Sequence, residues 1–153
     1  MDKRELKIDY VVWKNSFPEG YEELCQRAIQ ASQKAYAVYS GFSVGAAVLL
    51  EGGEIVVGNN QENGAYPSGM CAERTALFYA GAVYPEKRIK AVAIVAYDRN
   101  GMIENALTPC GACRQVMAEL IKRHAVDFDL VLMGKKESMV VSASALLPFP
   151  FGG

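Results

Sequence analysis

Three of the four cysteines in this 153-residue chain fall in two short motifs. Cys71 begins a Cys-Ala-Glu sequence that ends at Glu73, and Cys110 and Cys113 belong to a Pro-Cys-Gly-Ala-Cys sequence. Three cysteine thiolates can bind zinc and leave one tetrahedral position open, as in a catalytic site, whereas structural zinc sites have four protein ligands. A glutamate two residues from the first thiolate can move protons at that open position. The motifs predict one zinc ion bound by Cys71, Cys110 and Cys113, with Glu73 beside it.

A closed zinc site and a redox-active Cys-x-x-Cys pair are the alternative interpretations of these cysteines. A closed site needs a fourth protein ligand, and the remaining candidates are Cys25 and His124. We expect Cys25 beside the apolar stripe of a helix, where buried free cysteine is common. His124 falls at the expected end of another helix, where a cation interacts favourably with the helix dipole. Neither alternative explains Glu73, so the sequence favours the open site.

The charge and hydropathy of the chain indicate neither a nucleic-acid nor a membrane partner. Its 16 Lys and Arg residues nearly balance its 17 Asp and Glu residues, whereas nucleic-acid-binding domains usually carry a basic face. No apolar run is long enough to span a membrane. Residues 1–7 carry charges but precede no apolar segment, so we expect no signal peptide. We therefore expect a cytoplasmic protein whose cysteines are reduced thiols and metal ligands.

The N-terminal part of the chain predicts a short strand or arm followed by one long helix. Apolar residues alternate with outward positions over residues 6–12, as they do in a strand. Ser16 and Glu19 have the spacing of a capping box, with Pro18 in the first turn. Apolar residues then recur at steps of four and three over residues 24–38. This pattern predicts a helix that begins near Pro18 and continues to residue 38.

The remaining pattern predicts strands that alternate with helices. Gly52-Gly53 is a hairpin signal, and Thr108 and Pro109 suit the N-cap and first turn of a helix. In chain order we expect strands 44–50 and 54–58, a helix over 71–81, a strand over 91–97, a helix over 109–123, and strands 128–133 and 139–142. This order predicts a single layered α/β domain, residues 1–153, with a mixed sheet.

Both cysteine motifs fall at the expected starts of helices. Cys110 and Cys113 are three residues apart and therefore share one helix face. The N-terminus of a helix carries partial positive charge and free N–H groups, which stabilise a thiolate. Three thiolates with Zn²⁺ still carry a net negative charge, which weakens the metal as a Lewis acid. Arg74 follows Glu73 directly, and we expect its guanidinium to hydrogen-bond the ligand sulfurs and withdraw that charge.

These motifs resemble those of the small, homotetrameric, zinc-dependent cytidine deaminases of the cytidine/deoxycytidylate deaminase family. The likeness runs from about residue 24 to residue 151. The matching segments are residues 39–47, 60–63, 71–76, 109–115 and 146–148. The resemblance implies a three-layer α/β/α fold with a mixed five-stranded sheet. Residues 1–14 form an N-terminal extension relative to shorter members, and this extension can supply an extra strand.

The resemblance also implies roles for individual residues. In that family the residue matching Phe42 packs against the pyrimidine, and those matching Asn60 and Glu62 hydrogen-bond the ribose. The backbone of the residue matching Ala72 contacts the base. An aromatic residue matching Phe151 enters the pocket of a neighbouring subunit, which implies a homotetramer with shared active sites and one Zn²⁺ per subunit. Without the resemblance, an ordinary polar loop is the preferred interpretation of Asn60 and Glu62. Phe42 also suits the core, and Phe151 also suits a tail that covers the core of its own subunit.

The function that the resemblance implies is hydrolytic deamination of cytidine and deoxycytidine to uridine and deoxyuridine, with release of ammonia, in pyrimidine salvage. The alternatives are a zinc deaminase of another amine, such as blasticidin S, deoxycytidylate or a base in RNA, and a non-catalytic zinc-stabilised module. A polynucleotide substrate needs a basic groove, which the balanced charge does not suggest. A zinc-stabilised module has no need for Glu73, so this residue favours an enzyme.

Overall fold

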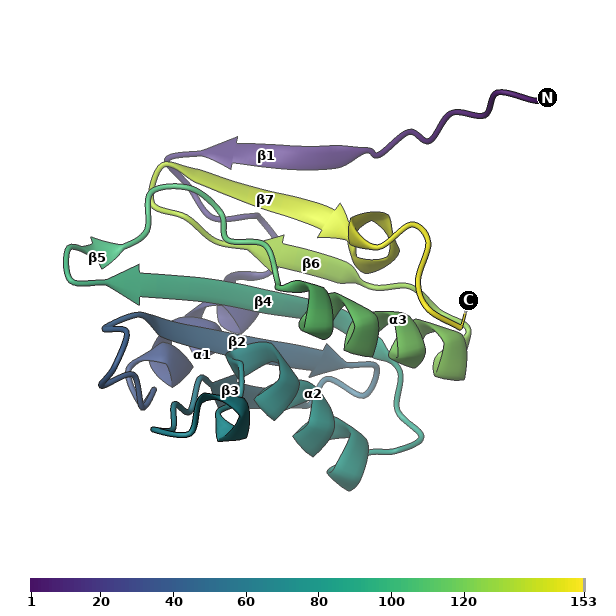
Figure 1. The fold of residues 1–153 in the computed structure, drawn as a ribbon. Helices are drawn as coiled ribbons and strands as arrows, with labels where there is room; N and C mark the ends of the chain where they lie inside the picture. Colours follow the sequence, from purple (N-terminus) through teal and green to yellow (C-terminus); the bar gives the residue numbers. More distant parts are fainter. Residues whose placement is uncertain (153) are drawn as a thin grey trace.

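The computed structural model describes residues 1–152, which form one mixed sheet covered on both faces by helices. The elements in chain order are β1 (Tyr10–Lys14), α1 (Glu22–Ser32), β2 (Ser43–Leu50), β3 (Ile55–Asn59), the 3-10 helix η1 (Tyr66–Ser68), α2 (Ala72–Val83), β4 (Ile89–Asp98), β5 (Gly101–Met102), α3 (Gly111–His124), β6 (Asp129–Leu132), β7 (Glu137–Ser142) and the 3-10 helix η2 (Ala143–Leu146). Helix α1 lies behind the sheet and helices α2 and α3 lie in front of it (Figure 1). The expected three-layer α/β/α architecture is therefore confirmed.

The sheet has seven strands, with β1, β7, β6, β4, β2 and β3 side by side and the short β5 paired with β4. Strands β4 and β6 are parallel, and the other pairs are antiparallel. The expected mixed sheet is thus confirmed, with the extra N-terminal strand present as β1. The sheet has seven strands instead of the five implied by the resemblance, because β1 and β5 are added to β2, β3, β4, β6 and β7. Strand β1 begins at Tyr10, later in the chain than the alternating pattern indicates. The sequence did not predict β5.

Two apolar clusters, one on each face of the sheet, form the core. On β2, Ala46 and Val48 face the cluster that contains α2 and α3, while Ala47 faces the cluster that contains α1. Strand β4 divides in the same way, because successive side chains of a strand point to opposite faces. Coverage on both faces explains why β4 is almost continuously apolar in sequence.

The first helix differs from its prediction at both ends. The chain adopts a positive φ of 83° at Gly20, and Ser16 bonds to the Lys14 carbonyl, so the expected capping box does not form. The helix ends at Ser32 because the next segment pairs with the chain after β3. The Tyr36 N–H donates to Asn60 O, and Tyr36 O accepts from the Glu62 N–H. This pairing replaces the helical hydrogen bonds expected up to residue 38.

The other elements agree with the sequence to within a few residues, except at the start of α3. Cys110 has extended dihedral angles and is the N-cap of α3, so the expected N-cap at Thr108 is wrong. Cys71 is the N-cap of α2 in the same way. Within residues 1–152, no helix is both long and apolar enough to cross a membrane.

Helix α2 approaches strand β3 closely at Gly58. A Cβ atom at this position would lie 2.6 Å from the Ala76 nitrogen and 2.7 Å from the Ala72 carbonyl oxygen. Both neighbouring atoms are backbone atoms of α2, and they cannot move aside independently. The absence of a side chain at Gly58 therefore sets how near the start of α2 lies to the sheet.

We expect Gly58→Ala to lower the free energy of unfolding by about 1–3 kcal/mol, because the new methyl group forces α2 outward. Gly81→Ala is the matched control, since a Cβ at Gly81 would have no atom within 4 Å apart from those of its chain neighbours and its own helix backbone. Alanine in a helix is about 0.5–1 kcal/mol more favourable than glycine, so this variant should be stabilised. Urea denaturation of both variants measures the difference. A Gly58→Ala protein as stable as the parent would contradict the close approach.

Candidate metal centre and pocket

The starts of α2 and α3 bring three cysteine sulfurs together on one face of the sheet. The Sγ atoms of Cys71, Cys110 and Cys113 all lie within 4.8 Å of one another. Cys71 and Cys110 are the N-caps of their helices, and Cys113 lies in the first turn of α3. Such a set of three soft thiolate ligands fits zinc and matches the ligand number of a catalytic site.

The three thiols differ in their surroundings. Cys113 is fully buried, and this burial, followed by the nearby Glu73 charge, raises the pKa of its thiol. Burial also acts to raise the pKa of Cys110, but hydrogen bonds from the Cys113 backbone N–H, the Cys113 and Cys71 side chains and the Ala112 N–H lower it overall. A thiolate at Cys110 is thus favoured by the free N–H groups of a helix start. Cys71 and Cys110 border the pocket described below.

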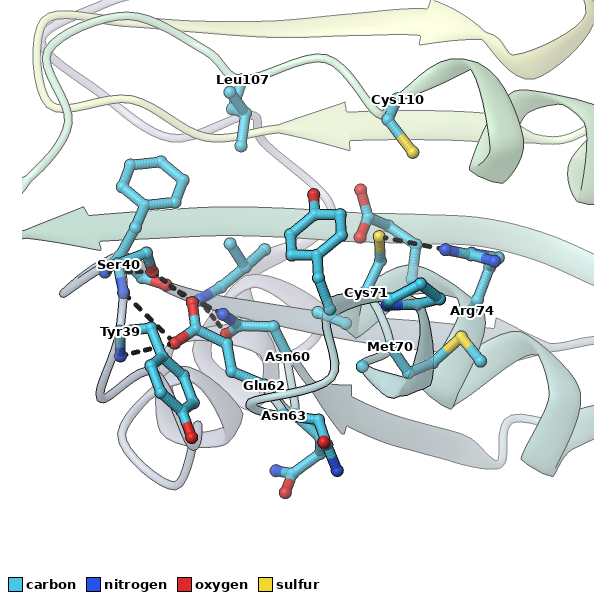
Figure 2. A pocket seen from close by; sticks show the side chains of 18 of the residues that line it. Tyr39, Ser40, Asn60, Glu62, Asn63, Met70, Cys71, Arg74, Leu107 and Cys110 are labelled. Atoms are coloured by element: carbon cyan, nitrogen blue, oxygen red, sulfur yellow. Dashed lines mark hydrogen bonds between the residues drawn. The ribbon is translucent and has the colours of Figure 1, made fainter.

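Arg74 lies against the first sulfur, as the sequence predicts. Its Nη2 is 3.5 Å from Cys71 Sγ, and the pKa of its guanidinium is raised, first by this hydrogen bond. Figure 2 shows Arg74 reaching Cys71 from one turn along α2. The guanidinium is therefore in a position to offset negative charge on the sulfurs.

Glu73 is the buried acid of the centre. Its side chain is 5% exposed, and it lines the same pocket as Cys71 and Cys110. Burial is the main reason why its pKa is raised, and its own backbone N–H and Arg74 act in the opposite direction. A carboxyl group in such a site exchanges protons closer to neutral pH than an exposed glutamate does.

A pocket of about 850 Å³ opens beside the cysteines. Its walls come from the loop before β2, the chain after β3, the start of α2 and the segment before α3. Figure 2 shows Cys71, Cys110 and Arg74 at one end, with Tyr39, Ser40 and Glu62 at the other. Phe42, Asn60, Glu62 and Ala72 all line this pocket, so the structure brings these four predicted site residues together with the metal ligands.

Glu62 holds the loop at the far end of the pocket. One carboxylate oxygen accepts from the Tyr39 N–H at 2.8 Å and the Ser40 N–H at 3.2 Å, and the other accepts from the Ser40 hydroxyl. The Ser40 hydroxyl bond is the largest reason why the pKa of Glu62 is lowered. Glu62 is therefore an anion at neutral pH.

Asn60 holds the backbone of Phe42 and Val44 through its side-chain amide. Its Oδ1 accepts from the Val44 N–H at 2.8 Å, and its Nδ2 donates to the Phe42 carbonyl at 2.9 Å. The side-chain amide retains a further N–H and a further acceptor site. Asn60 and Glu62 thus support the loop that carries Phe42 in addition to facing the pocket.

Phe151 does not line the pocket of its own chain. Phe151 is 89% exposed, as is Phe149, so neither ring covers the core of its own chain. The backbone of Phe151 is held against α3, where its N–H donates to Gln115 Oε1 and its carbonyl accepts from Gln115 Nε2. The two rings therefore point outward from an anchored segment.

Two sets of contacts were not anticipated from the sequence. Ser40 and Glu62 are 22 positions apart, and no local pattern links them. Arg114 donates hydrogen bonds to the Thr108 hydroxyl and to the Leu146 carbonyl. The segments that carry these two acceptors come together only in the folded chain. Ser40, Glu62 and Arg114 do lie within the segments that carry the family resemblance. This resemblance was the only indication in the sequence that these residues belong to the site.

The two residues considered as a fourth ligand lie elsewhere. Among residues 1–152, the clustered His, Cys, Asp and Glu side chains able to hold a metal are the three cysteines alone. Cys25 is buried in the cluster that contains α1, and burial raises the pKa of its thiol to about 12. His124 ends α3, as expected. The closed-site interpretation therefore has no support in this part of the chain.

Comparison with known proteins agrees with this geometry. Residues 18–127 match the family described as the cytidine and deoxycytidylate deaminase zinc-binding region. The chain belongs to this family, and zinc is the metal of its three-cysteine centre.

The individual relatives cover most of the chain. It is 44% identical over 130 residues to a cytidine deaminase from Halalkalibacterium halodurans, across 84% of this chain and 91% of the relative. A probable cytidine deaminase from Dictyostelium discoideum is 39% identical across 82% of this chain and 80% of its own length. The crystal structure of cytidine deaminase from Burkholderia pseudomallei superposes with a TM-score of 0.71 at 40% identity, covering 86% of this chain and 98% of that chain.

We expect Cys110→Ala to abolish stable zinc binding and to lower stability, because metal binding to thiolates is coupled to folding. Elemental analysis of the purified protein should fall from about one zinc per chain to nearly none. Cys25→Ala is the matched control, since this buried cysteine lies outside the cluster. That variant should lose stability but keep its zinc. Full zinc occupancy in Cys110→Ala would show that Cys110 is not a ligand.

Proposed function

We propose that this protein catalyses the hydrolytic deamination of cytidine and deoxycytidine. The reaction consumes water and releases ammonia together with uridine or deoxyuridine. The observation that carries the proposal is the buried carboxyl group of Glu73, which lines one pocket together with Cys71 and Cys110. The relatives named cytidine deaminase support the choice of a cytosine nucleoside as the substrate.

We assign the proton transfers to Glu73. Bound zinc supplies a Lewis acid that makes water acidic and nucleophilic near neutral pH. Glu73 accepts a proton from the attacking water, delivers one to the ring nitrogen N3, and returns one to the departing amine. Arg74 offsets the negative charge of the thiolates from its position beside Cys71. Its charge keeps the metal electron-poor, which is the role we assign to it.

We assign the far end of the pocket to the sugar. Asn60 offers an amide donor and acceptor, and Glu62 offers a carboxylate, which together suit the hydroxyl groups of ribose. The same carboxylate repels a phosphate group, so a nucleoside fits this end better than a nucleotide does. We assign Phe42 as an apolar wall for the pyrimidine ring and the Ala72 backbone as a contact of the base, because both residues line the pocket. The pathway we propose is pyrimidine salvage in the cytoplasm.

Ammonia release from a panel of amines tests the substrate. The panel holds cytidine, deoxycytidine, their monophosphates, cytosine, adenosine and blasticidin S. We expect turnover of the two nucleosides and at least 10²-fold less turnover by Glu73→Gln, roughly the contribution of a general acid–base residue. The variant should keep its zinc, since an amide replaces the carboxyl group at nearly the same size. Preferred turnover of a monophosphate or of blasticidin S would overturn the substrate assignment.

We further propose a homotetramer whose active sites are shared between subunits. The exposed ring of Phe151 extends from a segment that Gln115 anchors, and the pocket of its own chain does not contain it. A segment this apolar is unfavourable in water. In the arrangement that we propose, Phe42 of one chain and Phe151 of another enclose the pyrimidine.

We expect Phe151→Ala to raise the KM for cytidine by about tenfold or more, because a buried aromatic contact contributes more than about 1.4 kcal/mol. Phe149→Ala is the matched control, since both rings are 89% exposed. Co-expression of Phe151→Ala with Glu73→Gln chains should restore low-KM sites, because each inactive chain donates an intact Phe151. A mixture with the KM of Phe151→Ala alone would rule out shared sites.

A further inference from the structure

Arg114 joins three segments of the chain through one side chain. Its Nε donates to the Pro109 carbonyl at 2.7 Å, and its Nη2 donates to Thr108 Oγ1 at 3.1 Å. Its Nη1 donates to the Leu146 carbonyl at 3.0 Å. Two of these acceptors belong to the residues directly before Cys110, and the third closes η2. The side chain is half-buried, so water competes only partly for these bonds.

The two N-cap cysteines are held by different means. On the α2 side, Met70 directly precedes Cys71 and exchanges two backbone hydrogen bonds of 2.9 Å with Gln61. On the α3 side, the equivalent position is Pro109, which has no N–H and cannot form such a pair. The Pro109 carbonyl is instead bound by Arg114. Arg114 thus takes the place of the backbone pairing that holds the first ligand.

Cys110 depends on this support more than the other ligands do. Cys113 is fully buried inside the first turn of α3, whereas Cys110 is the exposed ligand at the N-cap. Its sulfur position therefore follows the backbone of residues 108–110. A small shift of that backbone moves the sulfur relative to the other two.

The other end of the link is itself held in place. Asp127 accepts hydrogen bonds from the Ser144 N–H at 3.2 Å and from the Phe128 N–H at 2.9 Å, and from the hydroxyl groups of Ser142 and Ser144. These bonds fix the start of η2, which packs beside α3 (Figure 1). The Leu146 carbonyl at its end is therefore a well-placed acceptor for Arg114.

We propose that Arg114 is the positioning residue for the zinc ligand Cys110, and that it acts by binding the segment before this cysteine to η2. The three donors are spread over the planar guanidinium group, which is why one side chain reaches three separate acceptors. A lysine keeps the charge but carries its donors on one atom, so it cannot span them. Without Arg114, Cys110 leaves the metal more readily while Cys71 and Cys113 remain bound.

The test uses the zinc-loaded protein and three variants: Arg114→Met, Arg114→Lys and Arg123→Met. Arg123 is the matched control, because it lies on the same helix, is exposed, and donates to the Pro85 carbonyl at 3.1 Å, away from the cysteines. Zinc transfer to the chelator 4-(2-pyridylazo)resorcinol is followed in native buffer, and the visible spectrum of the cobalt-substituted protein is recorded. These measurements contain no nucleoside, so they are independent of which amine is deaminated.

We expect zinc transfer to be about 10–100-fold faster in both Arg114 variants and within about twofold of the parent in Arg123→Met. The cobalt–thiolate bands should change in both Arg114 variants, since the ligand geometry is altered. Zinc transfer at the control rate in Arg114→Lys would overturn the proposal, because charge alone would then suffice. An unchanged cobalt spectrum would also overturn it, since Arg114 would then affect only overall stability. If Arg114→Met does not fold, the lysine variant decides.

Discussion

The N-termini of α2 and α3 meet at one point, and this meeting places the three cysteine sulfurs within 4.8 Å of one another. Cys71 and Cys110 are the N-caps of α2 and α3, and Cys113 lies one turn further into α3. Each helix start offers free N–H groups and partial positive charge, which favour thiolates over thiols. The sheet holds the two helices on one face, and the close contact at Gly58 sets the distance of α2 from it. The metal centre is therefore a property of the helix–sheet packing.

The pocket extends from this centre to the loop before β2, whose backbone is held by polar side chains. Asn60 and Glu62, in the chain after β3, bind the backbone of the loop before β2. These bonds fix the part of the pocket wall that contains Phe42. The backbone of Asn60 and Glu62 also pairs with that of Tyr36, and this pairing ends α1 earlier than the sequence predicts. Asn60 and Glu62 line the pocket and also determine its shape.

Several features were predictable because their signals are local. The three ligands, Glu73 and the start of α2 all fall within short motifs. The hairpin about Gly52-Gly53 and the apolar strand β4 were predicted correctly for the same reason. The capping box at Ser16 was a local signal too, but Gly20 adopts a positive φ and the helix starts beyond it. The local preference for a helix start at Ser16 was overridden there by the tertiary structure.

The metal ligands and the class of chemistry that they support can be predicted from the sequence, because they lie in two short motifs. How these residues are held depends on the packing of the folded chain. The contacts of Ser40 with Glu62 and of Arg114 with Leu146 join positions 22 and 32 apart in the chain. Hydrogen bonds across such separations depend on how strands and helices pack. No periodicity or local motif in the sequence predicts them. A side chain forms hydrogen bonds with the groups that lie near it in space, and this proximity exists only in the folded chain.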